Sequence, residues 1–495
     1  MTEQVISQDK FIEPLLKDQS SYVRYHIQPH ETEARKKLPH PFWPIISKFG
    51  LIKYLSFEAL DFNVKLVHKK YRKVLLQRPC IYGVFGRITG GLTPVRSKCV
   101  GCMRCVQEVP NVCKVKRNPK FYNLGDSFWI PEDMKLVSST PISLVNFEAS
   151  TGKILVKGMG YKGTFGSRQW YSMWTDMSEI VRPTRDGVYG REYISMSVDL
   201  GKRQQFVDFS QHSLASTSVL TSSLPIIFDF LPENLTSRDI EASIASAALQ
   251  TNTFFIIHYS QAKNLSEAQI NHAILLIDDS KSLFYDELIK NAPLIELTSE
   301  TLDIYKNVRN LRSNKPIAFR LKLSDNYKDT IAKIIALEFD ILHIEADYHG
   351  MTYESNSTFI KDAIRDIHQF LVKEKLRDKI SIIASGGIIL AEHVPKAIIC
   401  GSDVVAINTS ILVALQCEFK GEIRFPEKSK IKKESFDSKW GEQRLANLLS
   451  SWHNQCIEIL SAMGMRDIRR LRGDVGRAIF KEDIENEAFI DLEVV

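Results

Sequence analysis

Eight short apolar segments recur between residues 224 and 410, and they constrain the fold more than any other feature of the chain. Each is rich in β-branched or aromatic residues, as in LPIIFDF from Leu224 and PIAFRLKL from Pro316. The intervening stretches, such as RDIEASIASAAL and STFIKDAIRDIHQFLVKEKL, have the apolar spacing of amphipathic helices. Apolar strands that alternate with helices are typical of a parallel sheet covered by helices. The other six segments begin at Thr253, His272, Ala292, Ile341, Ile380 and Val404.

Eight such units within about 200 residues predict an α/β fold, a closed (β/α)8 (TIM) barrel. An open doubly wound sheet is the alternative, and the number of strands favours the barrel. We place the barrel at residues 222–420 and a helical extension at 421–495. Before the barrel we expect a basic helical region over 1–75, a cysteine-cluster segment over 76–122 and an irregular segment rich in glycine and aromatic residues over 123–221.

Five of the eight cysteines lie close together ahead of the barrel, and three of them follow a C-x2-C-x2-C pattern, at Cys99, Cys102 and Cys105. This spacing is the one with which bacterial ferredoxins hold an iron–sulfur cube. The fourth cysteine of that motif is absent, so another cysteine has to complete the set. Cys113 is the first candidate and Cys80 the second. We therefore expect Cys99, Cys102, Cys105 and Cys113 to bind a [4Fe–4S] cluster, with a four-cysteine zinc site as the alternative.

The composition is that of an ordinary globular protein, with 44% hydrophobic and 25% charged residues, which excludes disordered and fibrous classes. No apolar run is long enough to cross a membrane, and the first residues lack a secretory signal, so we expect a cytoplasmic protein. Residues 1–120 carry 22 Lys and Arg against 9 Asp and Glu. Such a basic region could face an acidic protein partner, but its one dense basic block, HKKYRK, gives little reason to expect nucleic-acid binding.

Candidate ligand-binding residues lie around the predicted seventh and eighth strands. Ser385, Gly386 and Gly387 follow the seventh segment, and Gly401 and Ser402 precede the eighth. In barrels of this kind the loops after strands seven and eight commonly hold a phosphate group. We therefore expect these five residues to bind the phosphate of FMN or of a sugar phosphate.

Lys322 ends the fifth segment, two residues after Arg320. A lysine at this position can stabilise negative charge on a flavin or hold a substrate carboxylate, or it can simply extend into solvent at the rim. The sixth segment ends in a titratable group that could take part in acid–base chemistry, namely Glu345, Asp347, Tyr348 and His349.

The cysteine run, the stretch GMGYKGTFGSRQWYSMWTDMSEIVRPTRDG, the segments ASGGI and GSDVVAINTSILVAL, and the C-terminal EILSAMGMRDIRRLRG together resemble the FMN-binding glutamate synthase domain family. The resemblance is to the stand-alone members with an N-terminal cluster-binding segment. It implies that the barrel binds FMN and that 2-oxoglutarate, through ammonia-derived 2-iminoglutarate, is reduced to glutamate. It also implies that Lys322 lies beside the flavin and substrate, and that Ser385, Gly386 and Gly387 form part of the phosphate cradle.

The resemblance therefore predicts a flavin-dependent iron–sulfur oxidoreductase that acts on a 2-oxo acid or an imine. Electrons would come from a ferredoxin-like or other donor. The second residue, Thr2, is not the cysteine nucleophile of a glutaminase, so a separate subunit could supply ammonia. The loops FDFLPENLTS, HYSQAKN and EADYHGMTYES, after the first, second and sixth segments, depart from the family. These departures leave a second hypothesis, a catalytically degenerate barrel that acts as a structural or electron-relay subunit; a zinc-stabilised barrel that binds a sugar phosphate is a third.

Overall fold

The computed structural model divides the chain into two compact units, which are described separately. The first contains residues 1–33, 145–155 and 168–495, and the second contains residues 34–144 and 156–167. The structure describes residues 27–35, 42–46, 84, 94–96, 99, 103–108, 113–118, 141–154, 169–175, 193–202, 219–278, 287–312, 315–354, 358–420, 424–432 and 434–489.

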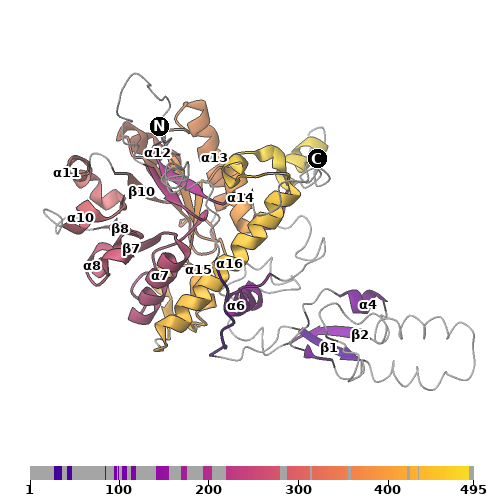
Figure 1. Cartoon of the computed structure of the whole chain (residues 1–495). Coiled ribbons are helices and arrows are strands. Elements are labelled where there is room, and N and C mark those ends of the chain that lie inside the picture. The colour runs from indigo at the N-terminus through magenta and orange to yellow at the C-terminus, as the bar shows by residue number, and fades with distance from the viewer. Residues whose placement is uncertain are drawn as a thin grey trace, which may run out of the picture. The chain divides into compact units, whose positions relative to one another are not determined.

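The first unit is built on a closed barrel of eight parallel strands, which confirms the predicted fold (Figure 1). The strands follow one another around the barrel in sequence order, and the last pairs with the first. Each of the eight predicted segments contains one of them. The strands are β6 (Ile226–Phe228), β7 (Phe255–His258), β8 (Ala273–Ile277), β9 (Leu294–Leu297), β10 (Ile317–Lys322), β11 (Ile341–Glu345), β12 (Ser381–Ser385) and β13 (Val404–Ile407).

Helices alternate with the strands and surround the barrel (Figure 1). Helix α7 (Arg238–Thr251) begins at Ser237, whose side chain accepts the Ile240 N–H, and ends at Asn252 in the left-handed conformation. Helix α13 (Ile360–Lys373) buries an apolar stripe of the spacing expected for a helix that lies on a sheet. The others are α8 (Tyr259–Ala262), α9 (Glu267–Ile270), α10 (Glu287–Asn291), α11 (Tyr305–Leu311), α12 (Tyr327–Ala336), α14 (His393–Cys400) and α15 (Thr409–Ala414).

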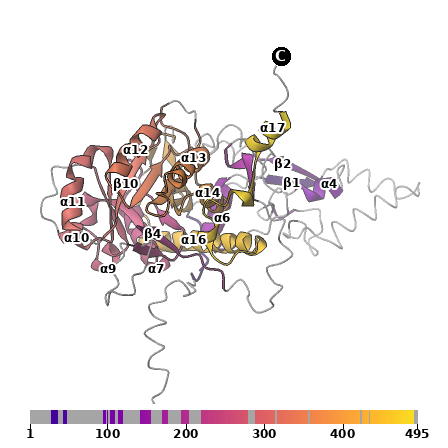
Figure 2. The ribbon, with the colours of Figure 1, turned by 90° about the horizontal axis from the view of Figure 1, so that it is seen from above.

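The C-terminal extension is helical, as predicted, and packs on the barrel. Helix α16 (Ser438–Ala462) lies along α7 (Figure 2). The close approach requires glycine at Gly441, because a Cβ there would come within 2.2 Å of the Ser243 Oγ. Further along α16, Trp452 Nε1 donates a 3.0 Å hydrogen bond to the buried Glu148 carboxylate of α6 (Pro141–Thr151). Helix α17 (Lys481–Phe489) follows strand β16 (Ala478–Phe480), which pairs with β3 (Met173–Thr175).

Two further strands precede the barrel in the first unit. Strand β4 (Val198–Gly201) pairs antiparallel with β5 (Val219–Ser222). Ser381 of β12 holds the end of β4, since its Oγ donates to the Gly201 carbonyl oxygen at 3.0 Å and accepts the Gly201 N–H at 3.1 Å.

The second unit contains a small antiparallel pair, β1 (Phe42–Ile46) and β2 (Cys113–Arg117), together with the short helix α4 (Arg104–Glu108). Most of the predicted helical region over 1–75 lies outside the described residues, and the described part of it includes strand β1. Within the described parts of the chain, no helix is both long and apolar enough to span a membrane.

Candidate functional site

Charged side chains fill the barrel interior near the carboxyl ends of the strands, where branched apolar side chains are usual. At the centre lies Arg320 of β10, whose side chain is 6% exposed. Its Nε donates to Glu345 Oε2 at 2.7 Å, and its Nη1 donates to Asp229 Oδ1 at 3.0 Å and lies 3.5 Å from Glu296 Oε1. One buried guanidinium is thus surrounded by three carboxylates from three other strands or strand ends.

The ion pairs outweigh the cost of burying these charges. Burial alone would lower the pKa of Arg320, but Asp229, Glu345 and Glu296 hold that pKa well above its ordinary value. Burial alone would raise the pKa of Glu345, yet Arg320 brings it below the ordinary range. The pKa of Glu296 is lowered against burial by His343 and then Arg320. The layer is therefore ionised at neutral pH.

Lys322 lies at the solvent end of β10 and differs from Arg320 in its surroundings. Its side chain is exposed, and its Nζ lies 5.7 Å from the centre of the Tyr353 ring. Within the described residues Lys322 forms no ion pair. The fifth strand therefore presents two cations: Arg320, neutralised inside the barrel, and Lys322, available at the rim.

The loop after β11 places two tyrosines by the charged layer. Tyr353 donates a 2.9 Å hydrogen bond to Glu345 Oε1. The Tyr348 hydroxyl is buried and has no hydrogen-bond partner in the described part of the chain. Burial, followed by the nearby carboxylates, raises the pKa of both tyrosines well above the ordinary value. Both hydroxyls therefore remain protonated and able to donate.

Three of the predicted residues lie at the carboxyl end of β12: Ser385 is its last residue, and Gly386 and Gly387 form the turn that follows. Both glycines have positive φ, +94° and +67°. A Cβ on Gly386 would come within 2.5 Å of the carbonyl oxygens of Ala346 and Asp347. Glycine is required here because the loop after β11 packs directly on the turn.

The structure brings this turn beside the end of β13, since Ser385 pairs with Ala406 across the two strands. Beyond Ala406, Ser410 has a fully buried Oγ that lacks a hydrogen-bond partner among the described residues. A buried hydroxyl without a partner costs stability unless a ligand or water satisfies it. The Gly386–Gly387 turn and Ser410 thus both lie at the carboxyl ends of neighbouring strands, β12 and β13.

Gly401 and Ser402 are not brought together with this turn. They precede β13, whereas Ser385 ends the parallel strand β12, so the two sets lie at opposite ends of the barrel. Gly401 has φ +128°, and a Cβ there would meet the His368 side chain at 2.4 Å. Ser402 is fully buried.

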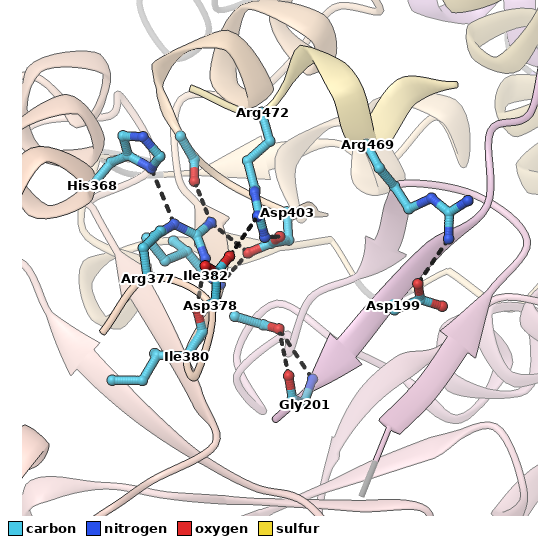
Figure 3. Close-up of polar contacts among 12 residues, drawn as sticks. Asp199, Gly201, His368, Arg377, Asp378, Ile380, Ile382, Asp403, Arg469 and Arg472 are labelled. Atoms are coloured by element: carbon cyan, nitrogen blue, oxygen red, sulfur yellow. Dashed lines mark hydrogen bonds and ion pairs between the residues drawn. The ribbon is translucent and has the colours of Figure 1, made fainter. Parts of the chain in front are cut away.

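Ionic contacts near Gly401 and Ser402 bind the C-terminal extension to the barrel (Figure 3). Asp403 accepts from Arg377 at 2.6 Å and from Arg472 at 2.9 Å. Arg377 Nε also donates to His368 Nδ1 at 3.0 Å, and Arg469 donates to Asp199 at 2.9 Å. The amino ends of TIM-barrel strands serve stability, in contrast to the carboxyl ends where catalysis occurs.

In the second unit, three of the four predicted cluster cysteines are described. Cys99 and Cys113 are buried, and Cys105 is partly exposed. A hydrogen bond between Cys105 and Cys113 raises the pKa of Cys113, with burial adding to the effect, and lowers the pKa of Cys105. Cys102 and Cys80 lie outside the described residues. Among the residues that are described, no group of three or more metal-ligating side chains is found.

Lys322 and the strand-seven turn are among the residues predicted from sequence, whereas Asp229, Glu296 and His343 of the charged layer are not. Asp229, Glu296 and His343 lie inside segments that are otherwise apolar. The available signal is a charged residue within a strand that is otherwise apolar. An unpaired buried charge is strongly unfavourable, so each such residue implies an oppositely charged partner inside the barrel.

Part of the barrel and of the C-terminal extension is similar to a known family. Residues 287–466 match the family model described as the conserved region in glutamate synthase. The archaeal-type glutamate synthase [NADPH] of Thermotoga maritima is 23% identical over 481 residues, which covers 82% of this chain and 92% of that protein. The archaeal glutamate synthase [NADPH] of Methanocaldococcus jannaschii is 32% identical over 195 residues, 35% of this chain and 38% of the other.

Among solved structures, a pyruvate-bound double mutant of flavocytochrome b2 matches with a TM-score of 0.41 and 13% identity. The match covers 63% of this chain and 76% of the other, and the likeness is too distant to support an assignment. The matched region spans β9 to β13 and the whole of α16, and so includes the strands that carry Glu296, Arg320, His343 and Ser385. Over residues 287–466 the chain is therefore similar to the conserved region of glutamate synthase.

Proposed function

We propose that this chain is a flavin-dependent oxidoreductase of the glutamate synthase type, with FMN bound at the carboxyl end of the barrel. The observation that carries the proposal is the ionised layer around Arg320, of which Arg320, Glu296 and Glu345 lie within the region matched to glutamate synthase. Buried, paired charges are poor contributors to stability relative to apolar packing and are common in active sites. The proposed reaction reduces 2-iminoglutarate, formed from 2-oxoglutarate and ammonia, to glutamate.

In this proposal, two regions at the carboxyl end of the barrel bind different groups. The backbone of Gly386 and Gly387, together with Ser410, would hold the phosphate of FMN. Lys322, the exposed cation at the end of β10, would attract a substrate carboxylate, and Tyr353 would help to orient Lys322 through its ring. When bound, FMN would supply hydride for the reduction. Gly401 and Ser402 have no part in this proposed site, because they lie at the other end of the barrel.

We further propose a [4Fe–4S] cluster on Cys99, Cys102, Cys105 and Cys113. The contact between Cys105 and Cys113 supports Cys113 as the fourth ligand. The protein would accept electrons from a ferredoxin-like protein or from NADPH, which the names of the related glutamate synthases specify. Ammonia would be free or supplied by another subunit, and the cytoplasm is the proposed location.

A second candidate function, an electron-relay or structural barrel without catalysis, is favoured by one specific observation. The loop after β11 packs on the Gly386–Gly387 turn and places the buried Tyr348 next to the charged layer. If the loop after β11 always covered the Gly386–Gly387 turn, little space would remain for FMN at the carboxyl end of the barrel.

Glutamate formation distinguishes the two functions. Anaerobic protein reconstituted with FMN is mixed with dithionite-reduced methyl viologen, 2-oxoglutarate and ammonium chloride, and glutamate is quantified by mass spectrometry. We expect sustained glutamate formation that requires ammonium, and a large decrease in the Lys322→Ala variant but not in Lys328→Ala, a matched change of an exposed lysine. Protein that binds FMN but forms no glutamate under these conditions would favour the relay function.

A further inference from the structure

The two-stranded ribbon of the second unit has an open face that carries positive charge around apolar side chains. Strands β1 and β2 are antiparallel, and residues directly opposite each other in such a pair lie on the same face. Trp43 thus shares a face with Lys116, and Ile45 with Lys114; the lysines are exposed and the two apolar side chains half-buried. The exposed guanidinium of Arg96 lies 5.2 Å from the centre of the Trp43 ring. These five residues are called the basic face below.

The cations of the basic face are not neutralised by the chain around them. Arg96, Lys114 and Lys116 form no ion pair with any residue that the structure describes. The sequence around them offers few opposite charges, since residues 34–120 contain 19 Lys and Arg against 3 Asp and Glu. Neighbouring like charges repel one another, so negative charge on another molecule would stabilise this face.

The make-up of the basic face fits an acidic protein better than a nucleic acid. Trp43 and Ile45 form an apolar centre with cations beside it, as in protein interfaces, where an apolar centre rich in Trp lies inside a polar rim. Single-stranded nucleic acids instead bind by stacking their bases on open aromatic rings. Arg96 covers one side of the Trp43 ring, which leaves less of the ring for a base.

We propose that the basic face is the docking surface for an acidic electron-carrier protein of the ferredoxin type. The inference rests on the proposed function, in which such a carrier supplies electrons. Cys113, a proposed cluster ligand, is fully buried and belongs to the same strand as Lys114, with its side chain on the opposite face. A carrier on the basic face would therefore lie one strand away from this ligand. The reduced carrier would lose one electron and the cluster would gain it, with no bond formed or broken.

The first experiment measures docking without turnover. The full chain is purified anaerobically and immobilised, and binding of an acidic bacterial two-cluster ferredoxin is followed by surface plasmon resonance. We expect the affinity to fall at least about tenfold from about 50 to about 500 mM NaCl, because salt screens exposed charges. Lys114→Glu combined with Lys116→Glu should lower the association rate about tenfold or more, whereas Trp43→Ala should mainly speed dissociation. A wild-type chain that does not bind the ferredoxin at the lowest salt concentration would overturn the proposal.

The matched control is another pair of exposed lysines separated by one residue, Lys373 and Lys375 of the barrel unit. Lys373→Glu combined with Lys375→Glu changes the net charge of the chain by the same amount, and it should leave the association rate close to that of the wild type. Equal losses in the two double variants would show that net charge, rather than the basic face, attracts the carrier. Binding of a single-stranded DNA oligonucleotide that is tighter than ferredoxin binding, and that needs Lys114 and Lys116, would assign the face to a nucleic acid instead.

Glutamate formation separates docking from the proposed function. The rate with reduced ferredoxin should fall in the Lys114→Glu, Lys116→Glu variant, whereas the rate with reduced methyl viologen, a small donor that needs no docking surface, should stay at the wild-type value. Equal loss of both rates would contradict a docking role for these lysines. A wild-type chain that binds ferredoxin through the basic face but forms no glutamate with either donor would refute the proposed function and not the docking surface.

Discussion

Arg320 Nη1 lies 3.0 Å from Asp229 Oδ1, and both side chains are at most 6% exposed, so the centre of the barrel is an ion pair rather than an apolar layer. This relationship has a direct consequence for stability. Asp229→Ala should lower the free energy of unfolding by about 3–5 kcal/mol, because it removes one partner of a buried charge pair. Urea unfolding followed by circular dichroism measures the change.

The matched control for Asp229→Ala is an exposed pair. Lys328 lies 3.2 Å from Asp366, with side chains 71% and 48% exposed. Lys328→Ala should change the free energy of unfolding by less than about 1 kcal/mol, because exposed ion pairs contribute little. Similar effects of the two substitutions would show that the buried layer is not the ionic centre described here.

Gly386 and Gly401, which have positive φ and lie at opposite ends of the barrel, should respond differently to substitution. Gly386→Ala and Gly401→Ala each force an alanine into positive φ and a close contact, and each should cost about 1–3 kcal/mol or more. Gly386→Ala should also weaken FMN binding, whereas Gly401→Ala should leave it unchanged. Flavin fluorescence titration measures the affinity, and equal losses in both variants would contradict the proposed position of the phosphate.

Acid should destabilise the attachment of the C-terminal extension through His368. Burial, with Arg377 and Arg472, lowers the pKa of His368 to about 4 from an ordinary 6.5. Between these values the unfolded chain binds a proton that the folded chain excludes, so this contribution is complete above pH 6.5 and is lost as the pH falls toward 4. Urea unfolding at pH 7.5 and pH 5 should show a smaller loss of stability for His368→Gln than for the wild type. An equal loss would mean that His368 contributes nothing to the pH dependence.

Cluster binding should depend on the four proposed cysteines and on no others. Serine substitution of Cys99, Cys102, Cys105 or Cys113 should remove most of the bound iron and the broad cluster absorbance, because each removes a thiolate ligand. Cys417→Ser, in the barrel unit, is the control and should retain iron. Zinc in place of iron in anaerobically purified protein would support the alternative metal site, and loss of iron in Cys80→Ser with retention in Cys113→Ser would reassign the fourth ligand.

The strands of the barrel could be predicted from sequence because each is a short apolar run between helical segments. The eight predicted segments each contain one barrel strand, from β6 in the Leu224 segment to β13 in the Val404 segment. This prediction depends on local patterns alone, since apolar strands alternating with amphipathic helices have few other stable arrangements.

The interior of the site could not be read in the same way. Arg320 and Lys322 are two residues apart on one strand, and both point along the same face, yet one is buried among carboxylates and the other is exposed. Their difference depends on Asp229 and Glu296, which come from distant segments. The sequence analysis groups Gly401 with Gly386 because loops around strands seven and eight commonly hold a phosphate group. Gly386 follows β12 and Gly401 precedes β13. Because the two strands are parallel, the two glycines lie at opposite ends of the barrel.

The central claim is most directly tested by the cofactor content of the protein. The visible absorption spectrum of anaerobically purified protein, with iron and flavin quantified on the same sample after incubation with FMN, measures both proposed cofactors at once. We predict flavin bands close to one FMN per chain, together with the broad absorbance of an iron–sulfur cluster. Protein that contains iron but binds no FMN after reconstitution would contradict the account of the barrel mouth as a flavin site.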